Sequence, residues 1–240
     1  MKNDSFQRFA AITAIVSFFT ALASNVLQGI PIHFNPKVMS DPTLTPSLGT
    51  NGASLLRWGL ILDVFGYYLP LLPVALLIQH RYRARNPEWV RFYTTCGLGY
   101  ILIGATGAVV LAAIQLPLNN AYAHASSEQR YVVESLTRII WNMVYGGMWN
   151  ILGELLVGIW FFGVGLLLRS ERRLLGIVSM VVGLSAFLDS LGNIIGLESL
   201  ALLGLSVYLL LTPIWALWMG VDLLRKSMPV QTVNSIREVL

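Results

Sequence analysis

The sequence has little charge and almost no cysteine. Of its 240 residues only 12% are Asp, Glu, Lys or Arg, against about 25% in a typical soluble domain. The mean hydropathy of +0.67 and the recurring apolar stretches of about twenty residues are typical of membrane-spanning helices. The single cysteine, Cys96, excludes an internal disulfide and a cysteine-based metal cluster.

The apolar stretches lack residues that several kinds of membrane protein need for cofactor binding or catalysis. His33, His80 and His124 lie at or beyond the ends of these stretches, so two histidines cannot ligate a haem within the bilayer. No lysine lies inside one to form a retinal-type Schiff base, and no phosphate-binding loop or zinc-protease motif occurs. We therefore expect no cofactor and no catalytic residues. The pI of about 9.4 does not indicate a nucleic-acid partner, because the basic residues gather at the ends of the stretches.

The apolar stretches predict an all-α membrane bundle of six transmembrane helices. The transmembrane domain is expected over residues 1–226, with a cytoplasmic tail over 227–240. The predicted spans are about 9–30, 55–79, 92–118, 146–168, 174–196 and 199–224. The tripeptide at 21–23, Ala-Leu-Ala, resembles a signal-peptide cleavage site. Because apolar character continues to Ile30, we favour a retained helix over a cleaved one, which would leave five spans.

Two connecting segments allow alternatives. Residues 31–54 are rich in proline and glycine and cannot cross a bilayer; they form either a lid over the bundle or a plain exposed connection. Residues 119–145 become amphipathic, and Ser126 with Gln129 matches a capping box. We predict an interfacial helix here, ahead of the fourth span, and one long continuous helix is the alternative. Its apolar row consists of Val132, Leu136, Ile139, Ile140 and Met143.

Polar and helix-breaking residues predict close packing in the first two spans. One face of the first span carries Thr13, Ser17, Thr20, Ser24 and Gln28. Hydroxyl groups at this spacing can link helices within lipid. In the second span, Pro70 and Pro73 remove backbone donors and should bend or locally open the helix.

The basic residues predict the orientation of the chain. With both termini in the cytoplasm, the inner side holds twelve Lys and Arg residues and the outer side holds four. The inner set is Lys2, Arg8, Arg81, Arg83, Arg85, Arg91, Arg169, Arg172, Arg173, Arg225, Lys226 and Arg237, and the outer set is Lys37, Arg57, Arg130 and Arg138. Because basic loops stay in the cytoplasm, we expect a multi-pass protein of the inner (plasma) membrane with both termini inside.

Three carboxylates inside the spans form the candidate site. Asp63, Glu154 and Asp189 lie 15 to 17 residues from the basic ends of their helices, which places all three roughly 22–26 Å above the inner boundary. A charged side chain at this depth is costly, so intramembrane acids are functional candidates by default. Glu154 shares its helix face with Asn150 and with glycines that allow neighbouring helices to approach. We therefore expect the three acids to meet in one layer.

Neighbouring polar residues complete this polar cluster. Asn150 and Asn193 lie within two turns of the acids, and Arg57 and Arg138 lie at or above their depth. In one interpretation the acids pair with these residues and only brace the fold. In the other they line a pocket that opens to the outer face and binds a ligand. Because like charges cannot cheaply stay ionised together, we expect the cluster to hold a proton, a bound cation, or a side chain of Arg57 or Arg138.

Two apolar elements carry a family resemblance. The first is the segment 55–66, which begins Leu-Leu-Arg-Trp-Gly and contains Asp63. The second pairs a span containing Phe-Phe-Gly at 161–163 with a basic turn and Leu-Leu-Gly at 174–176. With these elements, residues 9 to 224 resemble a bacterial multi-pass membrane family known as domain of unknown function 4386. The resemblance implies a membrane fold of six or seven helices and no established activity, so it transfers no catalytic residue.

Three functional hypotheses follow from the buried acids. The leading one is binding or transport of a small cation or amphiphile at an outer-leaflet cluster. The alternative is a non-catalytic accessory or regulatory membrane subunit whose acids are structural. A membrane enzyme acting on lipid head groups is the least favoured. The lipid bilayer is the one partner that the sequence itself indicates, and it identifies no partner protein.

Overall fold

The computed structural model describes residues 2–34 and 42–225, and in these two ranges every regular element is helical. The α-helices are α1 (Lys2–Gly29), α3 (Gly49–Asp63), α4 (Leu71–Tyr82), α5 (Pro87–Ala123), α6 (Ser127–Trp141), α7 (Glu154–Leu168), α8 (Arg173–Ile195) and α9 (Glu198–Arg225). Short 3₁₀ helices are η1 (Ile30–Ile32) and η2 (Pro42–Ser47), and π-helices are η3 (Val64–Tyr68) and η4 (Asn142–Gly153). The predicted tail at 227–240 lies outside the described residues.

In the described part of the chain, six helical runs are long and apolar enough to cross a membrane. They are Ser5–Ile32, Gly49–Tyr82, Pro87–Ala123, Ser127–Leu168, Arg173–Ile195 and Glu198–Arg225. Large apolar side chains such as Phe19, Leu102 and Leu210 are exposed along these runs, as expected for surfaces that face lipid tails. The predicted all-α bundle of six membrane-type helices is confirmed.

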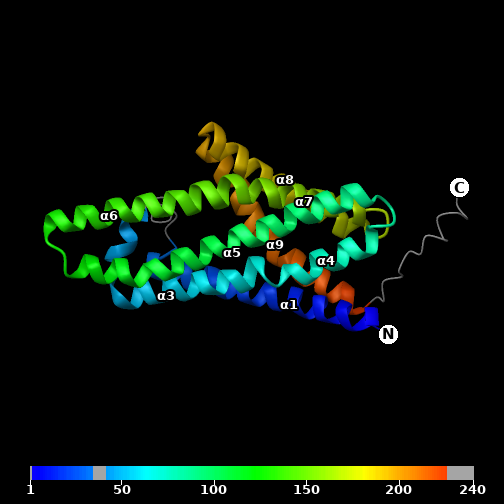
Figure 1. Ribbon diagram of the computed structural model, residues 1–240, viewed down its shortest axis with the longest axis horizontal. Helices are drawn as coiled ribbons and strands as arrows, with labels where there is room; N and C mark the ends of the chain where they lie inside the picture. Colours follow the sequence, from blue (N-terminus) through cyan, green and yellow to red (C-terminus); the bar gives the residue numbers. More distant parts are fainter. Residues whose placement is uncertain (1, 35–41, 226–240) are drawn as a thin grey trace, which may run out of the picture.

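The segment ahead of the fourth span belongs to one continuous helix. The structure has no break between α6, η4 and α7, which together form a run of 42 residues (Figure 1). The separate interfacial helix is therefore replaced by its alternative. The glycines at 146–147 suggested a break, but they lie inside η4, where the wider π-turn keeps the helix continuous. The predicted capping box is present, with Ser126 N donating to Gln129 Oε1 over 2.9 Å.

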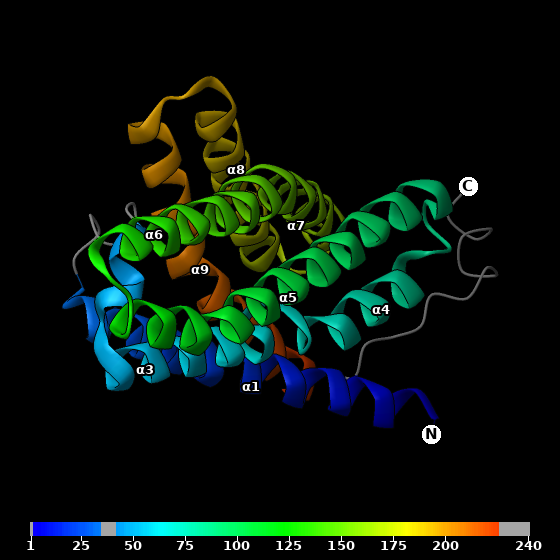
Figure 2. The ribbon, with the colours of Figure 1, turned by 60° about the vertical axis from the view of Figure 1, so that its left-hand side comes forward.

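The orientation of α6 explains why its sequence looked interfacial. Its apolar row points outward, with Val132, Leu136, Ile139 and Met143 all exposed. The opposite face packs against α5 and η2 through Val133, Thr137 and Trp141, which are buried. The hairpin of α5 and α6 forms one tip of the molecule (Figures 1 and 2).

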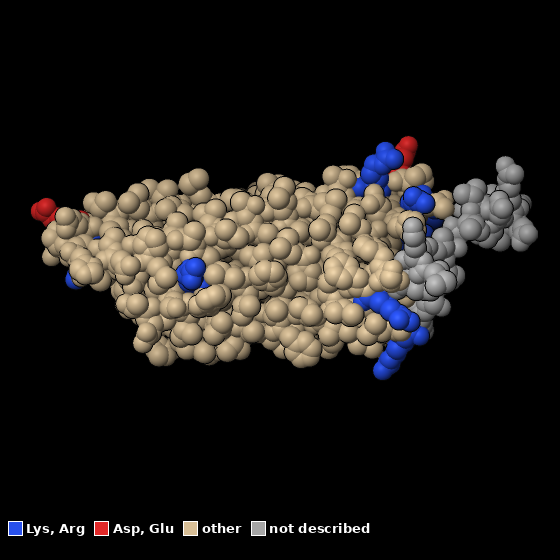
Figure 3. All heavy atoms as spheres, turned by 60° about the horizontal axis from the view of Figure 1, so that its bottom comes forward, with Lys and Arg blue, Asp and Glu red and all other residues tan. Residues whose placement is uncertain are grey.

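The two ends of the bundle differ in charge. Helix α1 starts and α9 finishes at one end, which we call the basic end (Figure 1). In Figure 3 most of the visible Lys and Arg side chains gather there, and the face between the two ends is nearly free of charge. We call the opposite end, where the α5–α6 hairpin projects, the distal end. The helices therefore have the charge pattern of a membrane bundle whose uncharged belt spans the lipid.

Ion pairs close the basic end. Arg81 of α4 pairs with Glu171 in the α7–α8 turn, and Tyr82 donates to the same carboxylate over 3.2 Å. Arg172 pairs with Asp222 of α9, and burial, followed by the nearby charge of Arg81, lowers the pKa of Arg172. These contacts tie α4 and α9 to the α7–α8 turn at this end.

Hydroxyl groups of α1 satisfy carbonyl groups that a proline leaves free. Pro70 has no N–H, so the carbonyl groups of Phe65 and Gly66 lose the partner that a continued π- or α-helix would supply. Ser17 donates to Gly66 O, and Thr20 donates to Phe65 O over 2.5 Å. The hydroxyl row predicted on the first span thus joins α1 to η3, and the predicted opening of the second span at the prolines is present.

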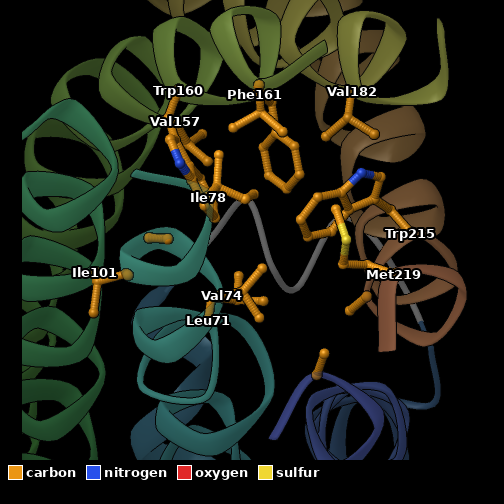
Figure 4. Packing of buried hydrophobic residues seen from close by; sticks show 14 of the residues in the cluster. Leu71, Val74, Ile78, Ile101, Val157, Trp160, Phe161, Val182, Trp215 and Met219 are labelled. Atoms are coloured by element: carbon orange, nitrogen blue, oxygen red, sulfur yellow. The ribbon is translucent and has the colours of Figure 1, made fainter. Parts of the chain in front are cut away.

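A hydrophobic core fills the bundle between its middle and the basic end. Figure 4 shows Trp160 and Phe161 of α7 facing Trp215 and Met219 of α9. Trp215 lies against Phe161 with ring centroids 4.8 Å apart and donates from Nε1 to Ser179 Oγ over 2.7 Å. Side chains of α4, including Leu71, Val74 and Ile78, complete the cluster. This packed layer lies between the basic end and the polar residues that are nearer the distal end.

Candidate functional site

The two π-helices place two of the candidate acids. Asp63 is the last residue of α3, directly before η3, and Glu154 is the first residue of α7, directly after η4. A π-turn widens the helix and changes which side chains face inward, and such turns are frequent at functional sites. Both carboxylates point into the interior and are buried, with 8% and 6% exposure.

Asp63 and Glu154 line one cavity, which we call the tyrosine cavity. Its volume is about 270 Å³. Five tyrosines and one tryptophan line it, namely Tyr67, Tyr68, Tyr100, Tyr145, Tyr208 and Trp149. Asn25, Gln28 and Asn150 add polar groups, and Ile32 and Phe34 lie at the start of the loop after α1. The described residues that line the cavity include two acids and no Lys, Arg or His, so no basic side chain of this lining offsets the carboxylates.

Hydrogen bonds from α1 orient Asp63. Ser24 Oγ lies 3.0 Å from Asp63 Oδ1 and 2.8 Å from Gly59 O, and Gln28 Nε2 donates to Ser24 Oγ over 2.8 Å. Since the hydroxyl has one proton, Ser24 shares it between the carboxylate and the backbone carbonyl. Gly59 makes this approach possible, because an added Cβ would lie 3.0 Å from the backbone N of Gln28.

Glu154 differs from Asp63 because one of its oxygens is unpaired. Oε2 of Glu154 is buried and has no hydrogen-bond partner among the described residues. An unsatisfied buried polar atom is costly and calls for a proton, a water molecule or a ligand. Among the groups that line the cavity, Glu154 is therefore the one best placed to bind a ligand.

Hydroxyl groups hold the aromatic wall in place. The Tyr100 and Tyr208 hydroxyl oxygens are 2.5 Å apart, and Tyr100 also donates to Tyr67 O over 3.1 Å. Asn25 Nδ2 donates to the Tyr67 hydroxyl over 2.9 Å. The ring of Tyr68 lies 5.2 Å from that of Tyr100, centroid to centroid. Side chains from α1, η3, α5 and α9 thus fix the wall as one unit.

Asp189 lies in a second cavity, which shares a wall with the first. This distal cavity has a volume of about 460 Å³ and is lined by η4, α8 and α9, including Asn142, Asp189, Asn193 and Glu198. Tyr145, Asn150, Leu205 and Leu209 line both cavities. Asn193 Nδ2 donates to Asp189 Oδ1 over 2.8 Å, while Asp189 Oδ2 is buried without a partner among the described residues. The two cavities are therefore neighbours that share part of their lining.

The candidate arginines lie outside both cavities. The guanidinium of Arg57 stacks over the ring of Trp58, 5.5 Å from its centroid. Arg138 is exposed on α6. Neither residue forms an ion pair within the described ranges. Their depth along the helix is suitable, but depth does not determine which face of the helix a side chain lies on. The pairing of Arg57 or Arg138 with the acids, one of the three expectations for the cluster, is therefore absent from the described residues.

The aromatic lining was not among the predicted site residues. Those residues are charged or amide side chains, whereas Tyr100, Tyr208 and Trp149 form much of the wall. A signal for the tyrosines was present, because Tyr100 and Tyr208 lie well inside the predicted spans. Tyrosines on membrane helices gather at the interfaces, and a hydroxyl deeper in the bilayer needs a partner within the bundle.

The fold and the site define a class of protein. It is a multi-pass α-helical membrane protein with acidic, aromatic-lined cavities in its distal half. The family model described as domain of unknown function (DUF4386) matches residues 8–226, and the chain belongs to this family. Comparison with curated proteins and with solved structures gave no match.

Proposed function

We propose that the protein binds a small organic cation, either free or as the head group of an amphiphile, in the tyrosine cavity. The observation that carries the proposal is the combination of Asp63, Glu154 and six Tyr and Trp side chains around one volume, with no basic residue in its described lining. A cation that enters this cavity meets two carboxylates and several aromatic faces.

Aromatic rings favour an organic cation over a metal ion. The faces of Tyr and Trp attract ammonium groups by about 0.5–2 kcal/mol each, and cages of such rings recognise methylated ammonium groups. Hard metal ions instead prefer six or more oxygen ligands. The cavity lining is mostly aromatic and aliphatic. Its polar groups are two carboxylates, three amides and the tyrosine hydroxyls. This mixture matches a cation that carries its charge on an alkylated nitrogen.

The size of the cavities limits the ligand. A volume of about 270 Å³ lies near the lower end of small-molecule pockets, which suits a head group with few carbon atoms. The distal cavity adds about 460 Å³ beyond the shared wall and contains Asp189 and Glu198. Because acids line both volumes, each of them attracts a cation.

The orientation that we propose places the basic end in the cytoplasm and the cavities toward the outer leaflet of a bacterial inner membrane. The positive-inside pattern of the basic residues supports it. The core around Trp160 and Trp215 and the ion pairs of Arg81 and Arg172 separate the tyrosine cavity from the basic end. Transport would require both layers to open, so binding from the distal side is the step that this conformation supports.

Thermal unfolding in a neutral detergent tests the proposal. Choline is compared with 3,3-dimethylbutan-1-ol, which has nearly the same shape and no charge. We expect choline to raise the unfolding temperature with saturation, since a ligand bound to the folded state stabilises it, and the alcohol to have little effect.

A matched pair of variants locates the effect. Glu154→Gln should abolish stabilisation by choline, whereas Glu128→Gln, which removes an exposed charge at the start of α6, should retain it. Equal effects of choline and the alcohol, or stabilisation that survives Glu154→Gln, would show that the acids only brace the fold, as in an accessory subunit.

A further inference from the structure

A third cavity lies at the basic end, far from the tyrosine cavity in the fold. It has a volume of about 380 Å³ and lies between the α4–α5 turn, the start of α5 and the end of α7. Its lining consists of Arg85, Asn86, Trp89, Tyr93, Leu166, Leu167, Arg169 and Ser170. We call it the basic pocket.

Two arginines from different turns supply its charge. Arg85 follows α4 and Arg169 follows α7, and Arg85 Nη1 donates to Ser170 Oγ over 2.8 Å. Glu171, two residues after Arg169, is already paired with Arg81. Within the described ranges neither Arg85 nor Arg169 forms an ion pair, so both guanidinium groups keep their charge available to an anion.

The start of α5 adds further donors. The helix begins at Pro87 after Asn86, whose side chain makes no capping hydrogen bond. The first N–H groups of a helix lack partners within the helix and carry a partial positive charge, which favours an anion. Glu88 lies in this first turn, but it is exposed and does not line the pocket. The helix start therefore lies beside the two arginines, since Asn86 lines the pocket with them.

The rest of the pocket is apolar and aromatic. Trp89 is 54% exposed, and its ring lies 5.7 Å from that of Tyr93, centroid to centroid. Leu166 and Leu167 belong to the last turn of α7. Tryptophan and tyrosine at a helix end are typical of the level of lipid head groups. The pocket thus joins an anion site to a surface that an acyl or glycerol group can cover.

We propose that the basic pocket binds the phosphate group of an anionic phospholipid. Basic pockets between membrane helices on the cytoplasmic side are suited to such head groups, and bidentate contact with guanidinium groups suits phosphate oxygens. A soluble phosphate shares this chemistry but leaves the apolar and aromatic lining exposed to water, so the lipid is the favoured source.

Lipid binding to the purified protein in neutral detergent tests the proposal, with native mass spectrometry as the readout. The probes are phosphatidylglycerol, phosphatidylcholine with the same acyl chains, and inorganic phosphate. The variant Arg85→Gln/Arg169→Gln is compared with Arg83→Gln/Arg91→Gln, which removes two exposed charges near the same end that do not line the pocket. Arg85→Lys/Arg169→Lys retains the charge and serves as the conservative variant.

The proposal predicts that phosphatidylglycerol binds wild type and the control pair alike. Loss of both pocket arginines should weaken this binding by about 10- to 30-fold, while the lysine variant, which keeps the charge and loses the bidentate geometry, should be weakened less. Equal weakening by both glutamine pairs would overturn the proposal, because a general basic surface would then suffice. Preference for inorganic phosphate over the lipid would also overturn it, and so would equal binding of the two lipids.

Discussion

Replacing Gly104 by alanine should displace one wall of the tyrosine cavity. Gly104 lies on α5, and a Cβ added there would overlap the ring of Tyr68. That ring lies between those of Tyr100 and Trp149, with centroids 5.2 and 6.5 Å away. Because Tyr68 is 7% exposed, it can leave the new methyl group only by shifting these neighbours or entering the cavity.

The expected effects can be estimated from the overlap. Overpacking a well-packed interior costs about 1–3 kcal/mol of folding free energy, so Gly104→Ala should lower the unfolding temperature. A displaced ring removes one cation–π contact of about 1–2 kcal/mol, which corresponds to roughly a tenfold loss of affinity. The assay is a choline titration followed by thermal unfolding in detergent.

A second glycine on the same helix provides the control. An added Cβ at Gly97 would lie 2.7 Å from Cγ of Trp160, within the hydrophobic core. Neither residue lines the tyrosine cavity or the distal cavity. Gly97→Ala should therefore cost similar stability and leave choline affinity unchanged. The reasoning fails if the two variants weaken choline binding equally, or if Gly104→Ala binds choline as wild type does.

Three further predictions concern the rest of the bundle. Glu171→Gln should destabilise the fold by about 1–2 kcal/mol. This is less than the roughly 3–5 kcal/mol for breaking a fully buried ion pair, because the Glu171 side chain is 27% exposed. Thermal unfolding measures the change, and an unchanged midpoint would contradict the prediction. Tyr100→Phe should cost more stability than Tyr208→Phe, because the second variant leaves Tyr100 its bond to a backbone carbonyl; the reverse order would be inconsistent with this network. Reporter fusions at Ser126 and Ser170 should lie on opposite sides of the membrane, and a shared side would rule out the six-span topology.

The cost of burying charge made part of the site predictable. Asp63 and Glu154 could be predicted because a carboxylate within an apolar span is costly and therefore marks a candidate site. The structure brings both to one cavity. Their depth could be estimated by counting residues along each helix. Asp189 has a similar depth, yet it lines the neighbouring cavity, since depth does not determine which helices are adjacent.

Helix rotation and helix type limited the rest. Arg57 and Arg138 have a suitable depth, but their side chains lie on other faces and reach neither cavity. The π-helix η4 carries the chain through Gly146 and Gly147 without a break, and glycine pairs alone do not distinguish a π-turn from an interruption. Tyr208 was missed because its role depends on a hydroxyl contact with Tyr100, 108 residues away in the sequence.

Isothermal titration calorimetry with choline tests the central claim most directly. Purified wild-type protein in neutral detergent should bind one choline per chain, and Glu128→Gln should do the same. Glu154→Gln should remain folded, because a neutral isostere removes a buried charge without changing its shape, and should show no saturable heat. Absence of binding to the wild type, or equal affinity in wild type and Glu154→Gln, would contradict the claim that Glu154 and the surrounding tyrosines form a cation site.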